Sequence, residues 1–215
     1  MESLVILISG QGSNMRALLD AKLPVKRITV ISNNPAAAGL EIARSHNITT
    51  HVIDHRLYSD RTTFDAALTE IIEACQPSLV ALAGFMRILG DNFVNRYQKR
   101  LINIHPSLLP AFSGLNTHAR ALQEGVRIHG CTVHFVTPQL DHGPIIIQAA
   151  VPVLAGDTPE TLGARVLQQE HLIYPQAVRW FLEGRITVAH GRVLVQSATH
   201  IKTKQYVLLS PNLDQ

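Results

Sequence analysis

The sequence contains few charged and few aromatic residues, 16% and 5% of its 215 residues respectively. A surface that stacks nucleic-acid bases needs aromatic side chains among clustered basic ones, and the basic residues here are scattered. We therefore expect no nucleic-acid partner. The formal net charge of +3 is compatible with an anionic ligand, and a small phosphorylated or carboxylated substrate fits it better than DNA or RNA.

Long apolar runs are also absent, because no stretch approaches the ~18 consecutive apolar residues of a membrane-spanning helix. Met1-Glu2-Ser3 leads directly into an apolar segment without a basic leader, so we expect a cytoplasmic protein with no membrane partner. The two cysteines, Cys75 and Cys131, lack a Cys or His partner at zinc-like spacing. We interpret both as small core residues rather than as a disulfide.

The first half of the sequence alternates apolar segments of strand length with segments of helical periodicity. Phe64, Leu68, Ile71 and Cys75 form one apolar stripe on a helix expected from about residue 59 to 75. The alternation predicts an α/β fold with a mostly parallel, Rossmann-like sheet flanked by helices. The expected strands are Leu4–Ser9, Arg27–Ser32, Thr50–Asp54, Leu79–Ala83 and Leu101–His105.

The pattern changes after residue 110, where two strand-like runs, Cys131–Val136 and Pro144–Val153, follow each other closely. A short connection of this kind predicts an antiparallel pair. A long helix is expected from Asp157 or Thr158 towards residue 184, with a kink or break at Pro175. A last short strand is expected at Val193–Gln196. Without repeats or linkers, residues 1–215 are expected to form a single domain.

A glycine-rich turn, Ser9-Gly10-Gln11-Gly12-Ser13-Asn14, follows the first expected strand and opens a helix. Such a turn lets free N–H groups at a helix N-terminus hold a phosphate. It is equally typical of a tight turn in which Ser13 only caps the helix. Arg16 occupies the place of the third glycine of a dinucleotide fingerprint, and no Gly-Lys-Ser/Thr follows, so NAD and P-loop binding are disfavoured.

Polar side chains gather at the end of the fifth expected strand. Residues two apart in a strand share a face, so Asn103 and His105 point the same way. Pro106 ends the strand at the edge where open α/β sheets bind ligands. An amide donor beside a protonated imidazole suits a reaction that develops an oxyanion. The alternative is a strand-end histidine whose nitrogens are satisfied by the backbone.

Asp141 can complete this group if its loop folds back over the sheet, because a nearby carboxylate stabilises an imidazolium. Otherwise Asp141 serves only its own turn. A metal site built from His105, His118, His134 and Asp141 is disfavoured by the lack of HExxH or His-x-His spacing, so no metal is expected. Ser107 lacks a Gly-x-Ser-x-Gly elbow, which disfavours a serine hydrolase.

Several motifs together resemble the phosphoribosylglycinamide formyltransferases, the folate-dependent formyl-transferring enzymes of purine synthesis. The resemblance continues through Gln169-Glu170-His171-Leu172-Ile173-Tyr174-Pro175 and so covers most of the chain. The motifs are the glycine-rich turn, Ala83-Gly84-Phe85-Met86-Arg87-Ile88-Leu89, Asn103-Ile104-His105-Pro106-Ser107-Leu108-Leu109-Pro110, Gly114-Leu115-Asn116-Thr117-His118 and Leu140-Asp141-His142-Gly143-Pro144.

The resemblance implies a role for each group of residues. Asn103, His105 and Asp141 would be catalytic. The ribose phosphate and glycinamide amine of the substrate would be bound by Gly12, Ser13, Asn14, Met15, Arg16 and Glu170. The folate would be bound by Arg61, Met86, Arg87, Ile88, Leu89, Asn103, Thr137, Leu140 and Asp141. Residues 1–100 would then form a phosphate-binding half, 101–190 a catalytic and folate half, and 191–215 a tail.

The implied reaction passes a formyl group from 10-formyltetrahydrofolate to the amine of glycinamide ribonucleotide, with small-molecule substrates and a monomer or homodimer as the expected state. The alternatives are a formyltetrahydrofolate hydrolase, a tRNA formyltransferase or a non-catalytic nucleotide- or folate-binding module. Two departures from the family pattern bear on loop shape: Ala111-Phe112-Ser113 after the Leu-Leu-Pro run, and His142 where a small residue is common.

Overall fold

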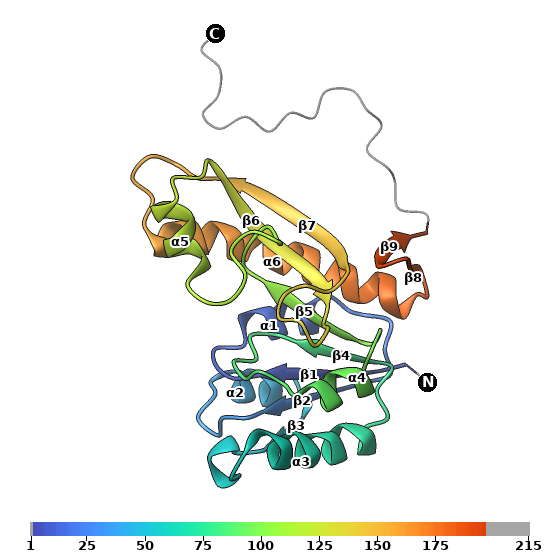
Figure 1. Cartoon of the computed structure of the whole chain (residues 1–215). Helices are drawn as coiled ribbons and strands as arrows, with labels where there is room; N and C mark the ends of the chain where they lie inside the picture. The colour runs from blue at the N-terminus through green and yellow to red at the C-terminus, as the bar shows by residue number, and fades with distance from the viewer. Residues whose placement is uncertain (1, 197–215) are drawn as a thin grey trace.

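The computed structural model describes residues 2–196, which form a seven-stranded sheet with the order β3-β2-β1-β4-β5-β6-β7 (Figure 1). Strands β1 to β5 are parallel, whereas β6 pairs antiparallel with both β5 and β7. The predicted fold class is therefore confirmed. The strands are β1 (Ser3–Ile8), β2 (Arg27–Ser32), β3 (Thr49–Val52), β4 (Leu79–Leu82), β5 (Leu101–His105), β6 (Ile128–Phe135) and β7 (Ile145–Pro152).

Helices cover both faces of the sheet, because the central strands are apolar on both faces. In β1, Leu4 and Ile6 pack with α1, α2, α5 and α6, whereas Val5 and Leu7 pack with α3 and α4. Figure 1 shows α3 and α6 on opposite sides of the sheet. The helices are α1 (Ser13–Asp20), α2 (Gly39–Ser45), α3 (Arg61–Ala74), α4 (Asp91–Arg96), α5 (Thr117–Gln123) and α6 (Pro159–Leu182), with a 3₁₀ turn η1 (His55–Leu57).

Helix α6 begins as predicted but is not interrupted at Pro175. Thr158 caps it, accepting from the N–H of Thr161 at 3.3 Å, and Pro159 occupies its first position. Of the kink or break expected at Pro175, the break is wrong, because the helix continues to Leu182. Tyr174 and Ala177 on either side of the proline are fully buried in the core, so burial offsets the lost backbone hydrogen bond.

The C-terminal part of the described chain forms a small hairpin of β8 (Ile186–Ala189) and β9 (Arg192–Val195). The strand expected at Val193–Gln196 corresponds to β9, and residues 197–215 of the predicted tail lie outside the described residues. Cys75 and Cys131 are both buried and unbridged, as predicted. Within residues 2–196, no helix has the length and apolar character needed to cross a membrane.

Candidate active site

Three loops meet at the carboxyl edge of the parallel strands, where ligands bind in open α/β sheets. They follow β1, β4 and β5, which are neighbours in the sheet. The backbone N–H of Ser9, after β1, donates to the carbonyl oxygen of Gly84, after β4, at 3.2 Å. The glycine-rich turn and the segment that contains Met86 therefore lie side by side at this edge.

Strand β5 presents Asn103 and His105 on one face, as its alternation predicts. Ile102 and Ile104 pack on the other face, in the core beneath α1 and α6. Antiparallel pairing places His134 of β6 opposite Asn103 and Thr132 opposite His105. The imidazole of His105 is almost fully buried, with 8% of its side chain exposed.

The loop between β6 and β7 folds back over the sheet and brings Asp141 to His105. The Oδ2 atom of Asp141 lies 3.6 Å from Nδ1 of His105 and accepts from the N–H of Gly114 at 2.8 Å. Asp141 has a φ of 53°, a left-handed conformation that Asp tolerates better than most residues. Gly143 is required two residues later, because a Cβ there would lie 1.7 Å from the carbonyl oxygen of Phe135.

Both ring nitrogens of His105 face hydrogen-bond acceptors. Nε2 lies 3.0 Å from the carbonyl oxygen of Phe112, and Nδ1 faces the Asp141 carboxylate. A neutral imidazole has one N–H, whereas the imidazolium has two and can donate to both acceptors. The segment from Pro106 to Asn116 therefore closes over the imidazole and supplies an acceptor for Nε2.

His134 is a fourth member of this group, which the sequence offered only as a ligand of a disfavoured metal site. Its Nδ1 lies 2.9 Å from the carbonyl oxygen of Phe135, and its Nε2 lies 3.3 Å from Nδ2 of Asn103. Burial lowers the pKa of His134, so the neutral ring donates through Nδ1 and accepts from the Asn103 amide through Nε2. Nε2 is also 3.9 Å from Oδ1 of Asp141. Only the pairing register of β5 and β6 reveals this contact.

The glycine-rich turn forms the N-terminus of α1, as predicted. Gly12 has a φ of 75° and caps the helix without a side-chain hydrogen bond, so Ser13 is not the cap. The first N–H bonded within the helix is that of Arg16, to the carbonyl oxygen of Gly12 at 2.8 Å. The N–H groups of Ser13, Asn14 and Met15 precede it and have no partner within the helix. This turn can therefore accept an anion.

Asn14 and Glu170, 156 residues apart in sequence, meet beside this turn. Nδ2 of Asn14 donates to Oε2 of Glu170 at 2.6 Å, and both side chains are buried. Burial raises the pKa of Glu170, and the Asn14 hydrogen bond opposes that rise. They lie on α1 and α6, the opposite face of the sheet from Asn103.

Two predicted ligand residues have side chains that the core encloses. Met15 is fully buried and Leu89 is 9% exposed, so only their backbone groups can contact a substrate. Their side chains are enclosed because the apolar stripe of a helix or loop end faces the sheet. By contrast, Met86, Ile88 and Leu140 are all more than half exposed at the carboxyl edge of the sheet.

The remaining predicted ligand residues lie near these groups. Arg87 stacks its guanidinium 5.1 Å from the centre of the Phe64 ring. Arg61, the first residue of α3, lies against Gly90. A Cβ added at Gly90 would lie 3.7 Å from Cδ of Arg61. Thr137 bonds within its own turn, donating to the carbonyl oxygen of Gln139 at 3.1 Å. Arg16 is exposed and pairs with Asp20 at 3.7 Å.

The formyl transferase family matches residues 2–178, which include every predicted site residue. The chain belongs to the formyl transferase family. It is 48% identical over 188 residues to the phosphoribosylglycinamide formyltransferase of Escherichia coli K12, covering 86% of this chain and 89% of that protein. This likeness confirms the resemblance that the motifs carry.

A bovine relative and a solved structure extend the comparison. The chain is 47% identical over 193 residues to the trifunctional purine biosynthetic protein adenosine-3 of Bos taurus, which is 87% of this chain but 19% of that protein. Glycinamide ribonucleotide transformylase 1 of Symbiobacterium toebii superposes with a TM-score of 0.88 at 48% identity, over 91% of this chain and 94% of that one. Both are formyltransferase or purine-synthesis proteins by name.

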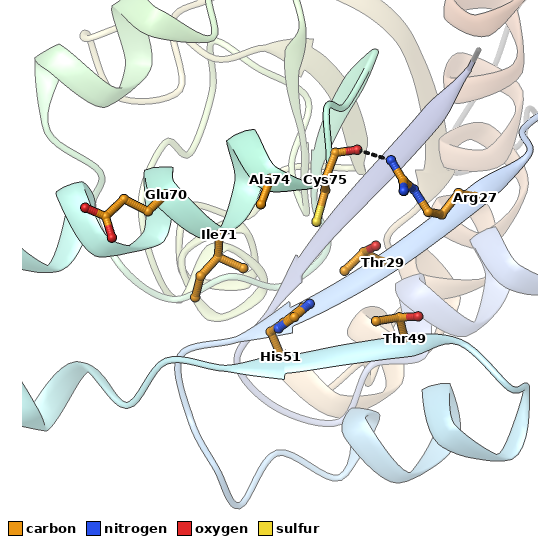
Figure 2. Close-up of a pocket in the computed structure, with 8 residues that line it drawn as sticks. All are labelled: Arg27, Thr29, Thr49, His51, Glu70, Ile71, Ala74 and Cys75. Carbon is orange, nitrogen blue, oxygen red and sulfur yellow. Dashed lines mark hydrogen bonds between the residues drawn. The ribbon is translucent and has the colours of Figure 1, made fainter.

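Two surface hollows differ in how close they lie to the predicted site residues. One, of about 810 Å³, adjoins the glycine-rich turn and is lined by Ser13, Arg16 and His171 among others. The other, of about 490 Å³, lies between α3 and strands β2 and β3, and Figure 2 shows Arg27, His51 and Glu70 around it. The second contains no predicted site residue.

Within the described residues, no group of three or more His, Cys, Asp or Glu side chains is arranged to hold a metal.

Proposed function

We propose that this chain transfers the formyl group of 10-formyltetrahydrofolate to the amine of N1-(5-phosphoribosyl)glycinamide. The products are N-formylglycinamide ribonucleotide and tetrahydrofolate, a step of de novo purine biosynthesis. The observation that carries the proposal is the cluster of Asn103, His105, His134 and Asp141 at the carboxyl edge of the sheet. The names of the relatives supply the substrates.

Asn103 and His105 are the groups that stabilise the developing charge. As the amine nitrogen bonds to the formyl carbon, the formyl oxygen becomes an oxyanion, and preoriented N–H donors stabilise it. His134 holds one N–H of the Asn103 amide, at 3.3 Å, and so leaves the other free to donate. The neutral His134 is therefore an orienting group, and Asn103 is the donor.

His105 acts as the general acid. It gives a proton to the folate nitrogen as the bond between that nitrogen and the formyl carbon breaks. The proton that the attacking amine loses then restores the imidazolium of His105, so that no net proton is consumed. Asp141, 3.6 Å away, stabilises the imidazolium before transfer. Because Phe112 occupies Nε2 at 3.0 Å, the substrate replaces the Phe112 carbonyl as the partner of that nitrogen.

The glycine-rich turn and the Asn14–Glu170 pair hold the amine substrate. The free N–H groups of Ser13, Asn14 and Met15 bind its phosphate, assisted by the positive end of the α1 dipole. Arg16 adds a positive charge at the edge of the hollow beside the turn. Glu170 accepts a hydrogen bond from the amine end.

The folate lies along the exposed side chains of Met86, Ile88 and Leu140. Backbone groups of residues 86–89 and 137–141 bind its ring, and Arg61 meets its benzoylglutamate part. The exposure of these apolar side chains supports this placement, because apolar side chains left exposed on a protein surface are available to a ligand. No metal or covalent acyl intermediate takes part in this reaction.

The test is turnover by the purified protein, followed by the absorbance change of the folate. We expect formyl transfer only when both 10-formyltetrahydrofolate and glycinamide ribonucleotide are present. Turnover without the amine would identify a formyltetrahydrofolate hydrolase instead. Binding of both compounds without turnover would identify a non-catalytic module, and formylation of methionyl-tRNA would identify a tRNA formyltransferase.

A further inference from the structure

The segment from Gly84 to Gly90, here called the 84–90 loop, joins β4 to α4 and carries the exposed Met86 and Ile88. None of its residues lies within a strand or a helix. A loop that recognises a ligand through its backbone must be held in one conformation, since each misplaced N–H or C=O loses its bond. Two polar side chains from other parts of the chain hold it, one at each end.

Ser9 holds the first end of the loop. Its hydroxyl oxygen accepts from the backbone N–H of Met86 at 2.8 Å and donates to Oδ1 of Asn33 at 2.5 Å. Its own N–H donates to the carbonyl oxygen of Gly84 at 3.2 Å. Ser9 thus bonds to the backbone on both sides of Phe85, and Asn33 fixes the orientation of its hydroxyl.

Asp65 on α3 holds the second end. Its Oδ2 accepts from the backbone N–H of Gly90 at 2.7 Å. The approach is close enough that a Cβ on Gly90 would lie 2.9 Å from this oxygen. Between the two anchors, Arg87 stacks on Phe64, the neighbour of Asp65, while Leu89 enters the core.

If stability alone is considered, a buried aspartate is unfavourable at position 65. The residue is 8% exposed, and its Oδ1 has no hydrogen-bond partner among the described residues. Burial raises the pKa of the Asp65 carboxyl, against the opposing effects of the Gly90 N–H, Arg61 and Arg87. A buried group that keeps one oxygen unpaired calls for a reason other than stability.

We propose that Ser9 and Asp65 are positioning residues that fix the backbone of the 84–90 loop for folate binding. Neither side chain touches the reacting atoms; each acts through a backbone N–H of the loop. The inference rests on the proposed function, in which this loop binds the folate ring. It extends that function by assigning the affinity for folate, and not the chemistry, to two residues outside the catalytic cluster.

The first experiment removes the Asp65 acceptor and restores it. Asp65→Ala should raise the KM for 10-formyltetrahydrofolate about tenfold, as loss of one charge-assisted hydrogen bond implies, with kcat and the KM for glycinamide ribonucleotide within about twofold of wild type. Asp65→Asn keeps an oxygen for the Gly90 N–H and should restore the folate KM. Gly90→Ala should reproduce the Asp65→Ala effect, because its methyl group displaces the carboxylate.

Glu73→Ala is the matched control, because Glu73 is an acidic anchor on the same helix that contacts Arg96 rather than the loop. It should leave the folate KM unchanged. Ser9→Ala should raise the folate KM about fivefold to tenfold, and the double variant with Asp65→Ala should show roughly the product of both effects. Binding of tetrahydrofolate, measured by calorimetry, should weaken by the same factors as the folate KM rises.

The possible outcomes distinguish a failure of the proposed function from a failure of the positioning role alone. A wild-type protein that neither binds tetrahydrofolate nor transfers a formyl group would overturn the proposed function. A wild type that does both, with an Asp65→Ala variant of unchanged folate affinity, would overturn the positioning role alone. Equal rises in both KM values, or no rescue by Asp65→Asn, would likewise reduce Asp65 to a structural residue.

Discussion

The two buried carboxylates of the site have opposite surroundings. Asp141 faces two imidazoles, at 3.6 Å and 3.9 Å, and one backbone N–H. Glu170 has one neutral donor, the Asn14 amide, and burial raises its pKa. The same functional group therefore lies beside two imidazoles at one end of the site and beside a neutral amide at the other. The difference separates a group suited to chemistry from one suited to recognition.

The largest expected effect tests the Asp141 side of this comparison. His105→Ala and Asp141→Asn should each lower kcat about a hundredfold or more, as general-acid and electrostatic roles imply. The measurement is steady-state formyl transfer by variants whose circular dichroism matches wild type. His142→Ala, next to Asp141 but exposed, is the control and should retain activity. Near-wild-type rates in either catalytic variant would remove that residue from the mechanism.

A smaller effect is expected where His134 orients Asn103. His134→Leu should lower kcat about tenfold, because the Asn103 amide loses the acceptor that fixes it. A double-mutant cycle with Asn103→Ala measures the coupling: once Asn103 is absent, the His134 substitution should cost little more. Additive losses in kcat would show that His134 acts independently of Asn103.

Substitution of Glu170 should change the binding of the substrate rather than the rate of the reaction. Glu170→Gln should raise the KM for glycinamide ribonucleotide severalfold, up to about tenfold, while kcat changes by less than about threefold. The folate KM should not change, since Glu170 lies on α6 and not on the 84–90 loop. A fall in kcat as large as that of Asp141→Asn would abolish the distinction between the two carboxylates.

The smallest expected effect is on stability and depends on pH. Because burial raises the folded-state pKa of Glu170 above its ordinary 4.5, folding favours the protonated form. That contribution is complete below the ordinary pKa and is lost as pH rises through the folded value. The Glu170→Gln variant cannot ionise at this position. The Tm of the variant minus the Tm of wild type should therefore increase by about 2–4 °C as the pH rises from acidic to slightly alkaline. A constant Tm difference across that range would contradict the raised pKa.

Much of the fold could be predicted from local pattern. Continuous apolar runs such as Leu4–Ser9 indicated strands buried on both faces, and the Thr158-Pro159 start of α6 was visible as a cap. At Pro175, where a kink or a break was expected, the helix does not break, because the local rule takes no account of burial: Tyr174 and Ala177 pack into the core on either side. A propensity of a few kcal/mol is overridden when several apolar side chains are buried together.

The sequence by itself determined the pieces of the site that are local. Alternation along β5 placed Asn103 and His105 on one face, and two glycines shaped the turn that opens α1. These features depend on residues within one strand or one turn, where geometry repeats every two or every 3.6 residues.

Only the tertiary structure decided which distant groups join them. Asn103 meets His134 across 31 residues, and Asn14 meets Glu170 across 156. Such contacts depend on the register of an antiparallel pair and on the packing of α1 against α6, which no local period specifies. Asp141 reaches His105 because Gly143 lets its loop pass against the carbonyl of Phe135. The local pattern therefore places individual polar residues, and long-range packing assembles them into one site.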